Sequence, residues 1–179
     1  PAVYTDVDRE IFTKHLEEES LTEASKKASG GNSLNLKEKY NRYLKTLVKV
    51  DKVSGGVYDK ILGDEYEIVL KNNPYKGNYG DDITAVVYFK GKPLASAQVE
   101  FYIKSPKGIY PQRLISDQSG QIYFKLSREG IYLLRSIYTL PSASKDADFE
   151  TWWTSYTFAF SSANELPNTY KEFGFGDAH

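Results

Sequence analysis

Apolar and polar residues alternate along much of the C-terminal two thirds of the chain, in short runs separated by glycine and proline. Apolar residues take every second position in 82–90 and again in 95–104, the pattern of a strand with one buried face. The turn between these two runs is expected at 91–93. Together the runs predict an antiparallel β-sandwich of roughly six to seven strands. The remaining strands are predicted at 114–116, 121–126, 130–138 and 151–160.

The N-terminal third shows a different period, with apolar residues at three- and four-residue steps. Residues 6–28 are predicted to form a helix that Asp6 caps and Gly30 ends. A second helix is predicted over residues 34–47, with Lys and Arg on its polar face. We expect this helical hairpin to pack against the strands. Its second apolar stripe would consist of Leu36, Tyr40, Tyr43, Leu44 and Leu47.

These patterns divide the chain into three parts. A helical hairpin segment is expected over 1–53, a β-sandwich domain over 54–162 with its first strand near Val57, and a tail over 163–179. The chain begins with Pro1 rather than Met. We therefore expect it to be a trimmed product of a longer chain.

Charge and cysteine content narrow the function classes. The 23 basic and 24 acidic residues are interspersed and give a net charge of -1, so neither nucleic acid nor an anionic membrane is expected as a partner. No apolar run reaches the roughly 18 residues that a membrane span needs. The chain contains no cysteine, which excludes thiol catalysis, disulfides and thiolate zinc sites.

Three acidic residues stand before the two tryptophans at 152 and 153. Asp146, Asp148 and Glu150 lie at alternate positions and would face a hard divalent cation together in an extended segment. The alternative, which we favour, is a solvated loop followed by a strand whose tryptophans fill the core. A second short motif, Asp117 to Gly120, resembles the start of a calcium loop, but a tight turn accounts for it without a metal.

Histidine is scarce. Besides His179 at the C-terminus there is only His15, on the predicted helix beside Glu18 and Glu19. His15 is a candidate metal ligand with these carboxylates, although a surface histidine on a helix is usually only solvated. No cofactor is expected unless these groups bind a divalent metal.

Tyrosine is abundant, with 15 residues, and four tyrosines of the predicted strands are expected to face outward. Such flat, amphipathic side chains would stack on a sugar or on a partner protein. The alternative is that they fill the core or form cross-strand pairs. The four are Tyr88, Tyr102, Tyr123 and Tyr132.

Neither a nucleophile elbow nor a pair of carboxylates placed to flank a glycosidic bond is visible in the sequence. We therefore expect no enzymatic activity and no catalytic residues.

Several motifs resemble known families. The turn and core segments 91–99, 116–121 and 130–134 are similar to those of carboxypeptidase-regulatory-like or transthyretin-like sandwiches. A wider set, which includes YNRYLKTLV at 40–48, EIVLKNNPY at 67–75 and DADFETWWTSYTF at 146–158, resembles a family of uncharacterised bacterial exported proteins once associated with nickel uptake. This second resemblance covers roughly residues 6 to 160.

The resemblance implies an address in the periplasm or at the cell surface, in a protein that is either secreted or a lipoprotein. We expect a non-catalytic binding or structural accessory module of the bacterial envelope, with a protein or a carbohydrate as partner. The alternative is a periplasmic metal-binding protein linked to uptake of nickel or another divalent cation. The sequence leaves the oligomeric state open.

Overall fold

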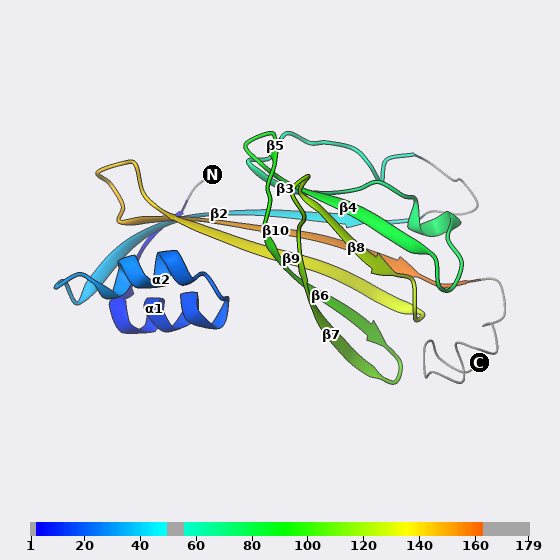
Figure 1. Cartoon of the computed structure of the whole chain (residues 1–179), viewed down its shortest axis with the longest axis horizontal. Coiled ribbons are helices and arrows are strands. Elements are labelled where there is room, and N and C mark those ends of the chain that lie inside the picture. The colour runs from blue at the N-terminus through cyan, green and yellow to red at the C-terminus, as the bar shows by residue number, and fades with distance from the viewer. Residues whose placement is uncertain (1–2, 50–55, 163–179) are drawn as a thin grey trace. The chain divides into compact units, whose positions relative to one another are not determined.

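The computed structural model describes residues 3–49 and 56–162, and the predicted tail at 163–179, with His179, lies outside this range. The fold is mainly β, with two helices and two sheets (Figure 1). The chain divides into two compact units, one of Pro1–Tyr43 with Ile137–Trp153 and one of Leu44–Ser136 with Thr154–His179. None of the helices in the described ranges has both the length and the apolar character that a membrane crossing requires.

The larger sheet has six strands in the order β1-β2-β10-β9-β6-β7. In the smaller sheet β3, β4 and β5 are neighbours and β8 pairs with β4. A short 3-10 helix, Pro74–Lys76, follows β3. The strand bounds are β1 Val3–Asp8, β2 Asn35–Leu47, β3 Tyr66–Leu70, β4 Asp82–Phe89, β5 Lys92–Pro93, β6 Gln98–Ser105, β7 Gly108–Ile115, β8 Gln121–Lys125, β9 Gly130–Pro141 and β10 Phe149–Phe160.

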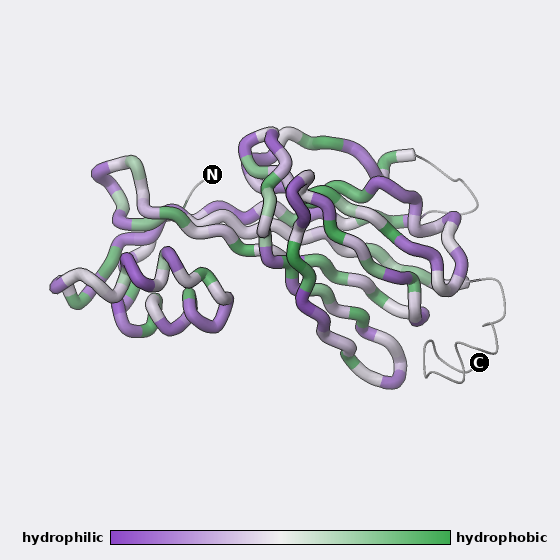
Figure 2. Tube along the Cα trace, viewed as in Figure 1, coloured by the Kyte–Doolittle hydropathy of each residue, from purple (hydrophilic) through white to green (hydrophobic). Residues whose placement is uncertain are grey.

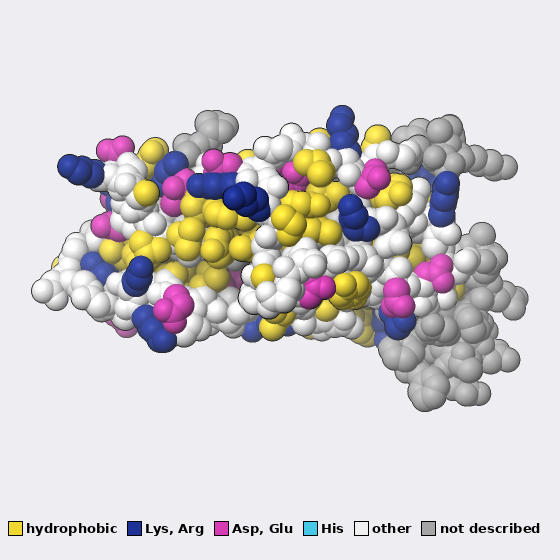
Figure 3. Space-filling model, turned by 45° about the horizontal axis from the view of Figure 1, so that its top comes forward, with side chains coloured by type: hydrophobic (Ala, Val, Ile, Leu, Met, Phe, Trp, Pro, Cys, Tyr) yellow, Lys and Arg dark blue, Asp and Glu magenta, His cyan; other side chains and the backbone are white. Residues whose placement is uncertain are grey.

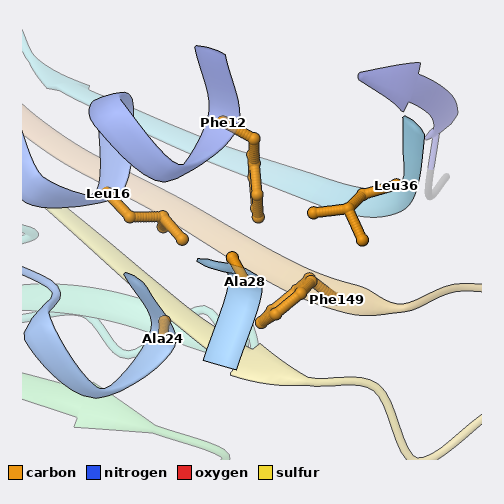
Figure 4. Close-up of a cluster of buried hydrophobic side chains, with 6 residues drawn as sticks. All are labelled: Phe12, Leu16, Ala24, Ala28, Leu36 and Phe149. Atoms are coloured by element: carbon orange, nitrogen blue, oxygen red, sulfur yellow. The ribbon is translucent and has the colours of Figure 1, made fainter. Parts of the chain in front are cut away.

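The first unit contains the two helices, α1 (Arg9–Glu18) and α2 (Thr22–Ser29). The carboxylate of Asp8 accepts a hydrogen bond from the Ile11 amide (3.0 Å) and caps α1. Apolar residues four positions apart on each helix face β2 and β10, where they meet one side chain from each strand (Figure 4). This cluster consists of Phe12, Leu16, Ala24, Ala28, Leu36 and Phe149.

The predicted second helix over 34–47 is wrong, because these residues form the strand β2. They pair antiparallel with β1, and Leu36 lies opposite Val7. The apolar positions at 36, 40 and 44 fit a helical period, but they also fit every second position of a strand. Pairing on both sides of β2 overrides the helix propensity of its Leu, Lys and Glu residues. The first helix also starts later than predicted, and Asp8 rather than Asp6 caps it.

In the second unit, side chains of the two sheets face each other and form one core. Phe124 of β8 lies 4.8 Å from Phe101 of β6 and 6.3 Å from Phe158 of β10, measured between ring centroids. The predicted strands are confirmed in β4, β6, β8, β9 and β10, with shifted ends, and the short run at 114–116 is the end of β7. Hydrophilic and hydrophobic residues alternate along these strands (Figure 2). Among the described residues from 56 onward, the first strand is β3, which begins at Tyr66 rather than near Val57.

The predicted turn at Asp117 is confirmed. Its carboxylate accepts hydrogen bonds from the amides of Ser119 (2.8 Å) and Gln121 (2.9 Å), and Gly120 takes a φ of +73°.

Packing is also confirmed for Trp152, which is 2% exposed. Hydrophobic side chains are nevertheless visible at the surface between Lys and Arg side chains (Figure 3).

Candidate binding surface

The predicted acidic cluster lies in and after the loop between β9 and β10, and its members have separate partners. The carboxylate of Asp148 accepts a hydrogen bond from the Lys37 amide (2.7 Å). Asp146 accepts one from the hydroxyl of Ser144 (3.0 Å). Within the described ranges, no group of three or more His, Asp or Glu side chains is placed to hold a metal ion. Metal binding by this chain therefore stays a prediction.

The third member of the predicted cluster, Glu150, lies on β10 and forms an ion pair with Lys39 of β2, with 2.6 Å between nitrogen and oxygen. Both side chains are largely buried, at 16% and 25% exposure. An ion pair this short compensates the charge of the Glu150 carboxylate without a metal ion. Lys39 and Glu150 therefore join β2 and β10 in the first unit.

His15 of α1 contacts an aromatic ring. Its imidazole stacks on the indole of Trp153, with 6.0 Å between centroids and 12° between planes. The guanidinium of Arg42 lies 5.2 Å from the Trp153 ring and 5.1 Å from the Tyr40 ring, within the range of cation–π attraction. These contacts join α1, β2 and β10, three elements that are far apart in the sequence. The ligand role proposed for His15 stays a prediction.

Tyr132, one of the four tyrosines predicted to face outward, lies in the core instead. It is fully buried, and its hydroxyl donates a hydrogen bond to the Arg128 carbonyl (2.7 Å). Burial raises the pKa of Tyr132 to about 12. The alternation along β9 turns residues 132, 134 and 136 inward, so the prediction that Tyr132 faces outward is wrong.

Tyr88 and Tyr123 share one face of the smaller sheet. Tyr123 of β8 lies opposite Thr84 of β4, four residues before Tyr88 on the same strand. Tyr123 is 54% exposed, and its hydroxyl donates to the carboxylate of Asp117 (2.9 Å). Tyr88 is only half-buried. These two tyrosines face outward, as predicted.

Tyr102 lies on the outer face of β6, between β7 and β9. The register places Tyr102 opposite Pro111 on β7 and Leu133 on β9. One step along, Lys104 lies opposite Ile109 and Ile131. We call this surface the Tyr102 face and define it by nine residues in cross-strand register together with Ile115, the next outward residue of β7. The ten are Glu100, Tyr102, Lys104, Ile109, Pro111, Arg113, Ile115, Ile131, Leu133 and Arg135.

Glu100 fixes the tyrosine. Its carboxylate accepts a hydrogen bond from the Tyr102 hydroxyl (2.5 Å) and another from the Arg113 guanidinium (2.9 Å). Arg135 contributes a third, longer contact of 4.0 Å. The tyrosine hydroxyl, and then the two guanidinium groups, hold the pKa of Glu100 below its usual range. The hydrogen bond to Glu100 therefore restricts the orientation of the Tyr102 ring.

The neighbouring strands β7 and β9 present apolar side chains on this face. Ile109, Ile115 and Ile131 are 63%, 64% and 48% exposed, and Pro111 is exposed as well. Exposed apolar side chains that lie together, with Tyr and Arg among them, are typical of protein interaction sites. The Tyr102 face also continues into a hollow of about 610 Å³, whose lining includes Ile131, Val48 and Ala159.

A buried ion pair in the second unit was missed by the sequence analysis. Lys45 of β2 and Glu67 of β3 contact each other, and their side chains are 9% and 2% exposed. Glu67 also accepts hydrogen bonds from the amides of Leu62 (2.7 Å) and Gly63 (3.2 Å), so the pair holds the loop before β3. Burial, and then the charge of Glu67, raises the pKa of Asp64 in this loop. The available sequence signal was a single carboxylate within the apolar run of β3.

Comparison with known proteins finds a family match for most of the chain. Neither the curated proteins nor the solved structures contain a match to this chain. Among protein families, residues 2–140 match the one described as Domain of unknown function (DUF4198). The match covers well over half of the chain and agrees with the resemblance to a family of uncharacterised proteins. The chain therefore belongs to the DUF4198 family.

Proposed function

We propose that this chain is a non-catalytic binding or structural accessory module of a bacterial envelope protein, and that it binds its partner through the Tyr102 face. The observation that carries the proposal is the cross-strand register that surrounds Tyr102 with Pro111 and Leu133. We further propose that its two facing sheets form a sandwich of the carboxypeptidase-regulatory or transthyretin-like type.

The Tyr102 face has the rigidity that a binding surface needs. It lies on three paired strands rather than on loops, with β6 held between β7 and β9. Tyr102 is anchored through its hydroxyl, so little side-chain entropy remains to be lost on binding. A fixed aromatic ring within an exposed apolar surround is the kind of residue that contributes most to interface affinity.

The charge state of Glu100 supports binding rather than proton transfer. The hydrogen bonds from Tyr102 and Arg113 keep this carboxylate ionised and lower its pKa. A general acid or base at neutral pH needs the opposite shift, toward the working pH. Glu100 is thus suited to holding Tyr102 and Arg113 in place.

The envelope location rests on the resemblance to bacterial exported proteins. The segments that carry it are 40–48, 67–75 and 146–158, which lie mainly on β2, β3 and β10. We propose the periplasm or the cell surface as the site of action.

Binding to envelope material tests the proposal. The full chain, labelled with a fluorophore, is titrated with a bacterial envelope fraction, and the Tyr102→Ala and Tyr123→Ala variants are compared. We expect saturable binding that Tyr102→Ala weakens about tenfold or more, as a truncated hot-spot residue does. Tyr123→Ala is the matched control, because Tyr123 is also an outward strand tyrosine bonded to a carboxylate. Equal affinities for the two variants, or no saturable binding, would reject the proposal.

A further inference from the structure

The apolar side chains of the Tyr102 face indicate the class of its partner. A single aromatic ring has aliphatic side chains on both neighbouring strands, among them Ile109, Ile131 and Leu133. Carbohydrate sites depend on aromatic faces that stack on the sugar and on polar groups that bond its hydroxyls. Aliphatic residues offer neither, whereas they pack well against apolar protein side chains. The composition of this face therefore favours a protein.

The charges of the Tyr102 face lie on both sides of its apolar row. On β6, Lys104 lies two residues after Tyr102. Glu100 lies two residues before it, in register with Arg113 on β7 and Arg135 on β9. Three cations against one anion leave this surface with a formal charge of +2, although the whole chain has -1. Along a strand, the distance from the Lys104 row to the Glu100 row is about 13 Å.

This arrangement disfavours a second copy of the chain. In a symmetric dimer through this face, each +2 surface would meet another +2 surface, and like charges across an interface are repulsive. A complementary partner would instead place carboxylates on either side of an apolar centre. We propose that the Tyr102 face binds a protein segment whose apolar side chains are flanked by acidic residues, an inference that rests on the proposed binding function.

A displayed library of random peptides tests this inference with the full chain as bait. The enriched peptides are sequenced, and their affinities are measured for the wild-type chain and for the Tyr102→Ala, Lys104→Glu and Lys92→Glu variants. Lys92 is an exposed lysine on β5 of the smaller sheet and serves as the charge control. We expect apolar residues flanked by Asp or Glu in the selected peptides. We also expect losses of about tenfold in Tyr102→Ala and Lys104→Glu, with no change in Lys92→Glu.

The outcomes separate this inference from the proposed function. Peptides that need Tyr102 but carry basic or uncharged flanks would overturn the acidic partner and leave the binding surface intact. Peptides that bind wild type and Tyr102→Ala equally would overturn both. Three other results would overturn the acidic protein partner. One is an absence of enriched peptides, and another is tighter binding of acidic oligosaccharides than of the selected peptides. The third is a dimer of the wild-type chain in sedimentation velocity that Tyr102→Ala abolishes.

Discussion

The buried ion pair of the second unit gives a sharp test of how this unit is held together. The substitution is Lys45→Met, which removes the ammonium group and keeps much of the apolar stem. Glu67, whose side chain is 2% exposed, would then remain as a buried carboxylate with two amide donors, from Leu62 and Gly63. The carbonyls of Ile68 and Lys60 would also lose the hydrogen bonds that Lys45 donates at 3.1 and 3.3 Å.

The expected cost follows from these contacts. Removing one partner of a buried pair leaves the other charge uncompensated and costs about 3–5 kcal/mol. The double variant Lys45→Met with Glu67→Gln removes both charges, and its carboxamide oxygen still accepts one amide. We therefore expect the double variant to lose less free energy of unfolding than the single one, by about 1–3 kcal/mol.

Urea unfolding followed by circular dichroism measures both free energies. The control is Lys26→Met, which breaks an exposed pair with Glu23, with side chains 68% and 86% exposed, and should cost no more than about 1 kcal/mol. If Lys45→Met cost as little as this control, or if the double variant were less stable than Lys45→Met, the argument from burial would be refuted.

Three further predictions concern other parts of the chain. Phe149→Ala should destabilise the helix-bearing unit by about 3–5 kcal/mol, measured by urea unfolding, because it removes a buried aromatic ring from the cluster in Figure 4. Asp117→Asn should flatten the acid limb of a plot of melting temperature against pH. The Gln121 amide lowers the pKa of Asp117 below its ordinary 3.8. The stability that the ionised Asp117 carboxylate contributes is therefore present above pH 3.8 and is lost as pH falls through the lowered pKa. Gly120→Ala should destabilise by at least about 1–2 kcal/mol in thermal unfolding, since φ is +73° and a Cβ would lie 3.0 Å from the Val87 carbonyl.

The sequence predicted most of the β-structure because the period of alternation matches the burial that the strands acquire. In β4 and β6, for example, Ile83 and Val99 begin runs in which every second residue is buried. The same logic failed for β2, where residues at 36, 40 and 44 satisfy a strand and a helix equally. Only pairing with β1 and β10 decides between them, and pairing is not encoded in a local pattern.

The candidate surface was predicted only in part. Tyr102 and Tyr132 were both expected to face outward from predicted strands, and Tyr132 proved to be buried. Pro111 and Leu133 could not be assigned to the surface, because their place beside Tyr102 depends on the register of two separate strand pairs. The charge that fixes Glu100 likewise comes from Arg113 on a neighbouring strand.

Site-specific photo-crosslinking tests the central claim, binding through the Tyr102 face, most directly. Benzophenone is placed on the Tyr102 face by Ile109→p-benzoylphenylalanine and on the smaller sheet by Tyr123→p-benzoylphenylalanine, two positions that are 63% and 54% exposed. The chains are irradiated on the envelope fraction, and adducts are quantified on gels. The account predicts a discrete protein adduct from position 109 and none from position 123. Adducts of equal yield from both positions, or from position 123 alone, would contradict it.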